Sequence, residues 1–458
     1  MIQDGYDISN MGDVFPAEKE IPQETGLTTN GKSIIKVIGV GGGGGNAIEN
    51  MYKQGISGVS FVAINTDRQA LDSLDIPEKL QLGPGLGAGG RPEKGKMYAE
   101  ETAEEIAKLF DDETEMVFIT AGMGGGTGTG ASPVVARIAR EKGVLTIGIV
   151  TIPFMFEGDK KILQALDGAD EMGKYVDAML LINNERLTEI YPDLSLDNAF
   201  DKADDTLTMA ARSISEMINV NGRINIDFED VKSTLKDGHT AIISSGYGEG
   251  ENRVTKAIQE ALNSPLLKNS EIKTSKRFLF NIYYSNNTEN ALKMGEMSEI
   301  NLFMANFAQD IDVIWGKTVD NSLGDKVKIT ILAAGFETTK SKKTTINRPN
   351  DGKSDKPKQD KTENNSNERI EDAYGTDLFN KFQVTKASTH YTVLDNNQLD
   401  NDMLINFLEK HPTFRRANDT QLQKELKQIL ETTTEAENEK EPEPKHNEQK
   451  SNKVIDFE

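Results

Sequence analysis

The chain has 458 residues, and its 74 Asp and Glu outnumber its 52 Lys and Arg, which gives a formal net charge of −22. Nucleic acids and anionic membranes both require a basic footprint, so we expect direct binding to neither. The absence of cysteine excludes a disulfide framework, and no apolar run approaches the roughly 18 residues of a membrane span.

The N-terminal segment, residues 1–32, is acidic and polar, and we expect it to be a disordered extension. It has neither the positive start nor the apolar centre of a signal peptide. Together with the missing cysteines, this predicts a cytosolic protein.

The first structured unit is a predicted strand, Ile34–Val40, followed by the glycine loop Gly41–Gly45 and a helical pattern, Asn46–Tyr52. Glycines allow successive backbone N–H groups to converge on an anion at a helix N-terminus, where the helix dipole also favours negative charge. This arrangement predicts a phosphate site.

The same loop has an alternative interpretation, because Gly39, Gly41 and Gly44 satisfy the G-x-G-x-x-G pattern of dinucleotide-binding enzymes. The next predicted strand, Ser60–Ile64, ends at Asn65-Thr-Asp67, where such enzymes keep a ribose-binding acid. Binding of a nicotinamide dinucleotide would therefore explain this loop, but it would give no function to the glycine loops that follow.

Two more glycine loops follow: Gly83–Pro92 precedes a helical pattern, and Gly122–Gly130 lies between the apolar run Met116–Ala121 and the helical segment Ala131–Lys142. A flexible linker is the alternative for the last loop, but linkers seldom separate a hydrophobic strand from an apolar helix. No Gly-Lys-Ser/Thr ending is present, so this is not a P-loop. Backbone amides, the Thr127 and Thr129 hydroxyls and a metal ion must then hold the phosphates.

The pattern along the chain predicts an α/β protein with two domains, a joining helix and disordered tails. Strands alternate with helices over residues 33–195, which indicates a parallel, doubly wound sheet. Residues 196–222 repeat apolar side chains every three or four positions and predict one long helix. Residues 223–338 predict a smaller α+β domain, and the polar residues 339–458 predict a disordered linker and tail.

The motif Gly-Gly-Gly-Thr-Gly-Thr-Gly within Gly124–Gly130 resembles the signature of the tubulin/FtsZ family of GTPases. The resemblance runs from about Ser33 to Glu337 and includes Pro153–Gly158, Asn184–Leu187, Ala199–Asp204 and Asn225–Val231. It implies a tubulin-like fold, GTP and GDP as ligands, and Mg²⁺ held by phosphates and water. It also implies a head-to-tail homopolymer that forms the division ring in the cytoplasm, near the inner membrane face.

The resemblance assigns nucleotide binding to residues of all three glycine loops and of the segments around them. These are Gly41, Gly42, Gly43, Gly44, Gly45, Asn46, Asn65, Ala88, Gly89, Gly90, Gly122, Met123, Gly124, Gly125, Gly126, Thr127, Gly128, Thr129, Gly130, Pro153, Glu157, Lys161, Asn184, Phe200 and Asp204.

Guanine selectivity is expected from Asp204, because a carboxylate accepts from the ring N–H and the amino group that guanine offers and adenine lacks. Phe200 would pack on the base, and Asn184 would add an amide. The alternative for Phe200 is a role in the core of the helix, and the alternative for Asp204 is a place on a solvated helix face. Glu157 matches a ribose contact. Lys161 stands where many relatives carry arginine, which puts that contact in doubt.

Catalysis is expected from Asn225, Asp227 and Asp230, which follow the long helix. At about 1.5 Å per residue, that helix carries them roughly 30 Å from the phosphate loops, so they reach only the nucleotide of a neighbouring molecule. There the two carboxylates and Asn225 would orient the attacking water. The alternative is that Asp227 merely caps the next helix and Asp230 lies in its first turn. A relative that binds GTP without hydrolysing it would lack this acidic pair.

The tail contains one apolar island, Met403–Leu408, followed by Pro412–Arg416. This segment, 403–416, resembles the short peptide by which the family recruits membrane adaptors and other division proteins. An incidental weak helix in a linker is the alternative. The final Val454–Phe457 is a further candidate for partner binding.

Overall fold

The computed structural model describes residues 28–29, 32–56, 58–193, 195–220, 222, 224–262, 275–287, 290–304, 311–336, 360–380, 402–411, 422 and 426. They belong to two units, residues 1–373 and residues 374–458, which are described separately. Most of the predicted N-terminal extension lies outside the described residues. Its described end forms a short antiparallel pair, β1 (Thr28–Thr29) and β2 (Lys32–Ser33).

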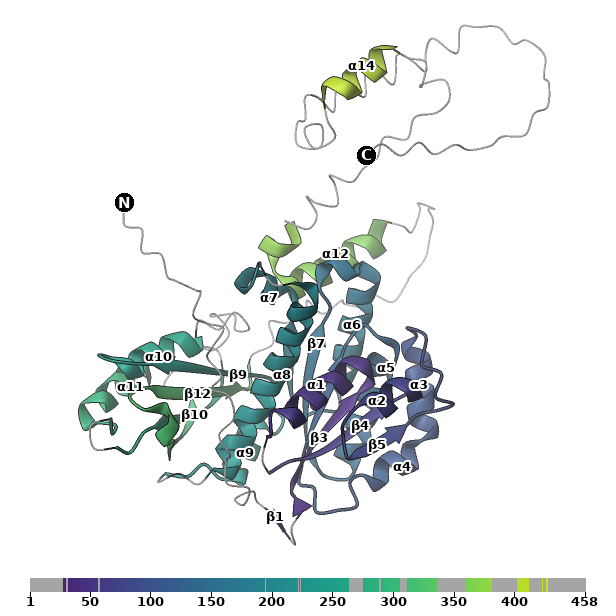
Figure 1. Cartoon of the computed structure of the whole chain (residues 1–458). Helices are drawn as coiled ribbons and strands as arrows, with labels where there is room; N and C mark the ends of the chain where they lie inside the picture. The colour runs from purple at the N-terminus through teal and green to yellow at the C-terminus, as the bar shows by residue number, and fades with distance from the viewer. Residues whose placement is uncertain are drawn as a thin grey trace, which may run out of the picture. The chain divides into compact units, whose positions relative to one another are not determined.

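Parallel strands form the N-terminal half of the body (Figure 1). Their order in the sheet is β8-β7-β6-β3-β4-β5. Their bounds are Ile35–Val40 (β3), Ser60–Asn65 (β4), Glu78–Gln81 (β5), Met116–Gly122 (β6), Leu145–Ile152 (β7) and Ala178–Asn183 (β8). Every residue of β3 and β7 is buried, as expected for strands covered on both faces. The predicted parallel, doubly wound sheet is confirmed.

The helices between these strands cover the two faces of the sheet. They are Gly41–Lys53 (α1), Arg68–Ser73 (α2), Pro92–Glu101 (α3), Ala103–Lys108 (α4), Gly126–Glu141 (α5) and Asp159–Met172 (α6), and the short helix Glu185–Ile190 (α7) follows the last strand, β8. Because all the strands are parallel, the loops that enter α1 and α5 leave the same edge of the sheet.

The predicted long helix is α8, Leu196–Asn219. The Ser195 hydroxyl caps its start by accepting from the Asn198 N–H, and its apolar stripe, including Ile214 and Met217, is buried in the main core. Near its end, the Glu216 carboxylate lies 3.0 Å from the Lys328 ammonium of the C-terminal part. The helix therefore packs on both halves of the body.

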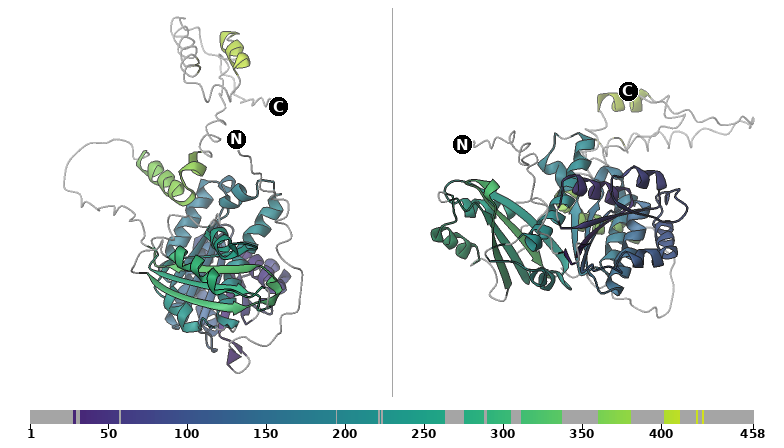
Figure 2. Two further views of the ribbon diagram at one scale, coloured as in Figure 1. Left: turned by 90° about the vertical axis from the view of Figure 1, so that its left-hand side faces the viewer. Right: turned by 60° about the horizontal axis from the view of Figure 1, so that its bottom comes forward.

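The C-terminal part is a mixed sheet, as the predicted α+β domain requires (Figure 2). Strand β12 (Val327–Ala334) is antiparallel to β9 (His239–Gly248) and β10 (Arg277–Tyr284), whereas β11 (Asp312–Val319) is parallel to β10. Its other helices are Phe228–Leu235 (α9), Arg253–Leu262 (α10) and Met297–Met304 (α11). The pairs Ala178↔His239 and Met179↔Thr240 join β8 to β9, so one continuous sheet runs through both predicted domains.

Two helices lie within the predicted linker and tail. Residues Asp360–Tyr374 form helix α12, and residues Asp402–Lys410 of the second unit form helix α14, which includes the apolar island predicted from the sequence. Single apolar side chains such as Ile370 and Leu404 are buried in these helices. In the part of the chain that the structure describes, no helix combines the length and apolar character needed to cross a bilayer.

Candidate functional site

The three glycine loops meet at the carboxyl edge of the parallel sheet. A Cβ atom on Gly43 would lie 3.4 Å from the Cα of Gly122, so the first and third loops touch through their backbones. A Cβ on Gly126 would lie 2.9 Å from that of Ala88, which brings in the second loop. A side chain on Gly126 would overlap the second loop, and a Cβ on Gly41 would lie 2.8 Å from the Gly128 nitrogen of the third loop. Steric overlap therefore accounts for glycine at these two positions.

Both long helices that begin at this edge have starts suited to an anion. Helix α1 begins at Gly41, whose φ of 77° favours glycine, and α5 begins at Gly126 after an N-cap glycine. In neither helix does a side chain of the N-cap residue accept a hydrogen bond from the first turn. The free amides and the helix dipoles therefore point at the space between the loops.

Hydroxyl and amide side chains fix the shape of the third loop. The Thr129 hydroxyl accepts from the Gly124 N–H at 2.8 Å, and the Thr127 and Thr66 hydroxyls lie 2.7 Å apart. The Gln164 amide of α6 donates to the carbonyls of Gly124 at 2.8 Å and Gly125 at 3.3 Å. Gln164 was missed from the sequence, where nothing distinguishes it from any polar residue on a helix.

An aromatic cluster lies where α8 begins. The Phe200 ring meets Phe154 edge-on at 5.2 Å, and Phe156 stacks on Phe154 at 5.2 Å. Phe200 is 40% exposed, so it is not the plain core residue of the alternative interpretation. Phe154 was not predicted as a site residue, although its segment, Pro153–Gly158, carried the resemblance.

Asn184 and Asp204, the predicted polar contacts to the base, both lie in surroundings that are unfavourable for an isolated polar group. The side-chain oxygen of Asn184 is buried and accepts no hydrogen bond within the described part of the chain. Burial, reinforced by the nearby Asp201 and Asp205 carboxylates, raises the pKa of Asp204 to about 7.

Glu157 and Lys161 are paired with each other at the rim of the site. The Lys161 ammonium lies 2.5 Å from one Glu157 oxygen, and the other oxygen accepts from the Phe154 N–H at 2.9 Å. The Glu157 carboxylate therefore closes the short 3₁₀ turn η2 (Met155–Glu157). Next to it, Pro153 limits the third loop, since a Cβ on Gly124 would lie 2.8 Å from the Pro153 ring.

The remaining predicted residues of this edge divide into exposed and internal ones. Gly42, Asn46, Gly89 and Gly90 are exposed, whereas Asn65 is buried and its side-chain oxygen accepts from the Asp67 N–H. The Asp67 carboxylate caps α2 by accepting from the Ala70 N–H at 3.2 Å. Because this acid serves a helix, the dinucleotide alternative loses its ribose-binding residue.

The predicted catalytic residues lie at the other end of α8 (Figure 1). Asp227 and Asp230 form a reciprocal capping box at α9: the Asp227 oxygen accepts from the Asp230 N–H at 2.9 Å, and the Asp230 oxygen accepts from the Asp227 N–H at 3.0 Å. The Asn225 oxygen accepts from the Gly222 N–H. Asn225 and Asp227 are exposed, so these groups face solvent and not the glycine loops of their own chain.

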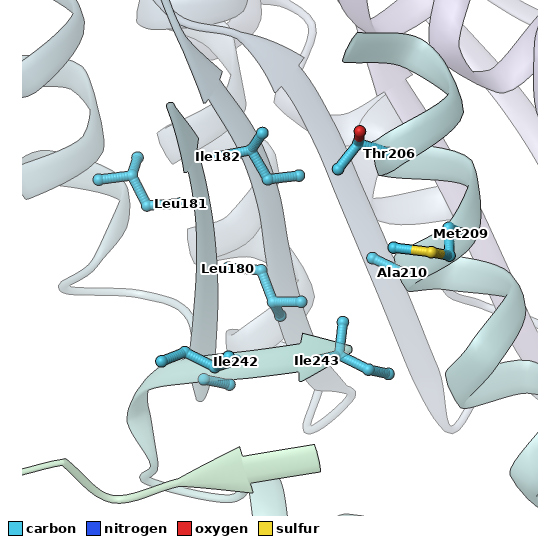
Figure 3. A pocket seen from close by; sticks show the side chains of 9 residues that line it. Leu180, Leu181, Ile182, Thr206, Met209, Ala210, Ile242 and Ile243 are labelled. Carbon is cyan, nitrogen blue, oxygen red and sulfur yellow. The ribbon is translucent and has the colours of Figure 1, made fainter. Parts of the chain in front are cut away.

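An apolar cleft separates α8 from the sheet below it (Figure 3). It is lined by Leu180 and Ile182 of β8, Met209 and Ala210 of α8, and Ile243 of β9. No charged side chain lines the cleft. The Thr206 hydroxyl is the one polar side-chain group in this lining, so the cleft is a poor site for a phosphate.

Comparison with known proteins identifies the relatives of this chain. Residues 34–192 match the Tubulin/FtsZ family, GTPase domain, and residues 239–337 match the FtsZ family, C-terminal domain. The cell division protein FtsZ of Porphyromonas gingivalis is 52% identical over 84% of this chain and 85% of its own length. The chain belongs to the FtsZ family. It is therefore a GTPase of the cell-division cytoskeleton, as the resemblance predicted.

Solved structures give the same relationship. The FtsZ dimer of M. jannaschii has a TM-score of 0.60 at 37% identity, covering 66% of this chain and 88% of that one. The GTPγS-bound protofilament of CetZ2 from Haloferax volcanii has a TM-score of 0.57 at 21% identity, covering 66% of this chain and 93% of its own, and shows the shared fold alone. Self-association is thus a property of the family, whereas the roles of individual site residues remain predictions.

Gly44 tests the contact between the loops and the sheet. A Cβ at this position would lie 2.4 Å from the Thr120 carbonyl oxygen, so Gly44→Ala should destabilise the protein by roughly 1–3 kcal/mol and weaken GDP binding. Gly42→Ala is the matched control, because its Cβ would meet no atom within 4 Å. Thermal unfolding without nucleotide compares the two, and equal midpoints would contradict the packing described.

Asp204 makes nucleotide affinity depend on pH. Its raised pKa keeps the carboxyl protonated below about pH 7, and guanine needs the ionised form, so GDP affinity should fall about tenfold from pH 8 to pH 6. Asp204→Asn should bind GDP weakly and remove most of this dependence. Titration of a fluorescent GDP analogue measures both, and a flat wild-type profile would exclude Asp204 as the base contact.

Proposed function

We propose that this protein binds GTP at the glycine-loop edge of one subunit and hydrolyses it with Asp227 and Asp230 of the next subunit. One observation carries the proposal: the phosphate-binding loops and the acids lie at opposite ends of α8, whose 24 residues span about 36 Å. A group at one end cannot act on a ligand at the other. Head-to-tail stacking brings the two ends together and repeats as an open filament.

The binding half of this site follows from the loop geometry. The triphosphate would take the N–H groups that begin α1 and α5, and the base would lie against Phe200 with Asp204 and Asn184 as its hydrogen-bond partners. The M. jannaschii FtsZ dimer, at 37% identity, supports self-association as part of this function. GDP would remain in the same pocket after hydrolysis and weaken the contact.

Mg²⁺ would accompany the triphosphate, bound by phosphate oxygens and water. The residues at the glycine loops fit this arrangement, because they offer backbone amides and hydroxyls in place of a carboxylate cluster. Within the described residues, no group of three or more His, Asp or Glu is placed to hold a metal ion. The ion would balance the charge of the phosphates, and the acids of the neighbouring subunit would act on the water.

The acids are arranged to act as a pair. The capping box holds the Asp227 and Asp230 carboxylates at the first turn of α9, where each uses one oxygen on a backbone N–H. The remaining oxygens face outward and can accept protons from a water molecule, orienting it toward the γ-phosphate. Asn225, two residues before Asp227, would position the same water.

The wider role follows from family membership. We place the filament in the cytoplasm, at the mid-cell division ring near the inner membrane face. The segment 403–416 would bind division proteins and membrane adaptors. Helix α14 supports this, since Met403 is 72% exposed while Leu404 and Phe407 are buried within the second unit. Pro412–Arg416 and Val454–Phe457 lie outside the described residues.

Substitution of Asp227 by asparagine distinguishes a capping role of this residue from a catalytic one. Asparagine caps helices as well as aspartate does, so Asp227→Asn should keep the thermal midpoint and GDP affinity while turnover falls about 100-fold or more. A loss of stability in step with activity would mean that the residue serves only as a cap.

Mixing two inactive variants tests the shared site directly. Asp227→Asn retains a complete pocket, and Asp204→Asn retains the acids, so an interface between the two should hydrolyse GTP. The mixed sample is expected to exceed the summed rates of the separate samples severalfold. Simple addition of the two rates would indicate that each subunit works alone.

The GTPase rate should also depend on assembly of the filament. The GTPase rate per molecule should rise steeply above a threshold protein concentration, and GTP but not GDP should bring the protein into the pellet on centrifugation. A constant rate per molecule at every concentration would argue for a self-contained active site.

A further inference from the structure

Helix α12 packs against α6 and the carboxyl end of β8 in its own chain. Arg369 reaches two carboxylates one turn apart on α6: one guanidinium nitrogen lies 2.8 Å from Asp167, and another lies 3.0 Å from Asp170. Such a fork between two acids fixes both the position and the direction of the helix. This contact joins residues about 200 positions apart.

The same turn of α12 makes an apolar and a backbone contact. Ile370 is only 2% exposed, although the described side chains on either side of it are half-buried or exposed. A single helix cannot bury such a side chain by itself. The Ala373 carbonyl accepts from the Asn183 side-chain amide at 3.2 Å. Ion pairs, a buried apolar side chain and a hydrogen bond therefore all hold α12 in place within the five residues from Arg369 to Ala373.

Asn183 connects this contact to the nucleotide pocket. It is the last residue of β8 and directly precedes Asn184, and its side-chain oxygen accepts from the Glu185 N–H. The Glu185 carboxylate in turn accepts from the Met155 N–H, in the turn that contains Glu157. Figure 1 shows α12 at the same end of the body as α7, which follows β8.

We propose that α12 is an intramolecular brake on assembly: docked along α6 and at the carboxyl end of β8, it would obstruct the incoming subunit that covers this edge of the sheet. This inference rests on the proposed head-to-tail contact. Docking of the helix and docking of a neighbour exclude each other, so only the undocked fraction is competent to extend a filament. The ion pairs of Arg369 lie at the centre of this contact, and the side chains of Asp167 and Asp170 are 69% and 77% exposed. Salt therefore screens these ion pairs and should weaken the docking of α12.

The test uses the full-length chain with Arg369→Glu. Removing the fork should free α12, and an isolated helix of 15 residues is only marginally stable in water. Its amide hydrogens should then exchange at least about tenfold faster than in the wild type. The critical concentration for GTP-dependent pelleting should fall at least about threefold. The control Glu368→Lys changes the charge of the exposed neighbouring side chain and should change neither quantity.

A charge swap tests whether the ion pairs themselves hold α12 in place. Arg369→Glu combined with Asp167→Arg and Asp170→Arg should restore both slow exchange and the higher critical concentration. Equal exchange in the wild type and Arg369→Glu would overturn the docking, and release of the helix with an unchanged critical concentration would overturn the brake. The exchange measurement needs neither GTP nor polymer, so it is independent of the proposed active site.

Discussion

A long helix separates the two groups of residues on which the proposed chemistry depends. Phe200 and Asp204, the proposed base contacts, lie in the first turns of α8, and the helix ends just before the loop that presents Asn225 and Asp227. One face of α8 is buried in the main core, which holds its two ends apart. In the proposed mechanism one end binds the nucleotide and the other supplies the acids, so a single subunit would not be sufficient for hydrolysis.

The binding edge depends on close backbone contact. The three glycine loops lie close together, and a side chain on Gly41 or Gly126 would overlap a neighbouring loop. Helices α1 and α5 begin here without a side-chain cap, which suits an anion at their first turns. Around them, Gln164 and the two threonine hydroxyls hold the third loop in shape. The unpaired Asn184 oxygen and the raised pKa of Asp204 indicate a pocket built for a partner with N–H donors.

Much of the fold was predictable from the sequence, because a strand, a glycine loop and a helix follow one another directly along the chain. Each of these elements is determined by its local residue pattern. The parallel sheet, the long helix, the α+β part and the capping role of Asp227 all follow from local patterns. The joining of β8 to β9 into one sheet was not predictable, since only two residue pairs form it. Gln164 and the fork between Arg369 and α6 were also missed, because ordinary polar residues give no signal of contacts formed far along the chain.

The proposed arrangement would link three processes near one edge of the sheet. Nucleotide binding, contact with the next subunit and docking of α12 would all involve the carboxyl ends of the parallel strands, so each would affect the others. The most direct test is a cryo-microscopy structure of the polymer with a slowly hydrolysed GTP analogue. The account predicts Asp227 and Asp230 of one subunit within reach of a water molecule at the γ-phosphate bound by its neighbour. Acids turned away from that phosphate would contradict it.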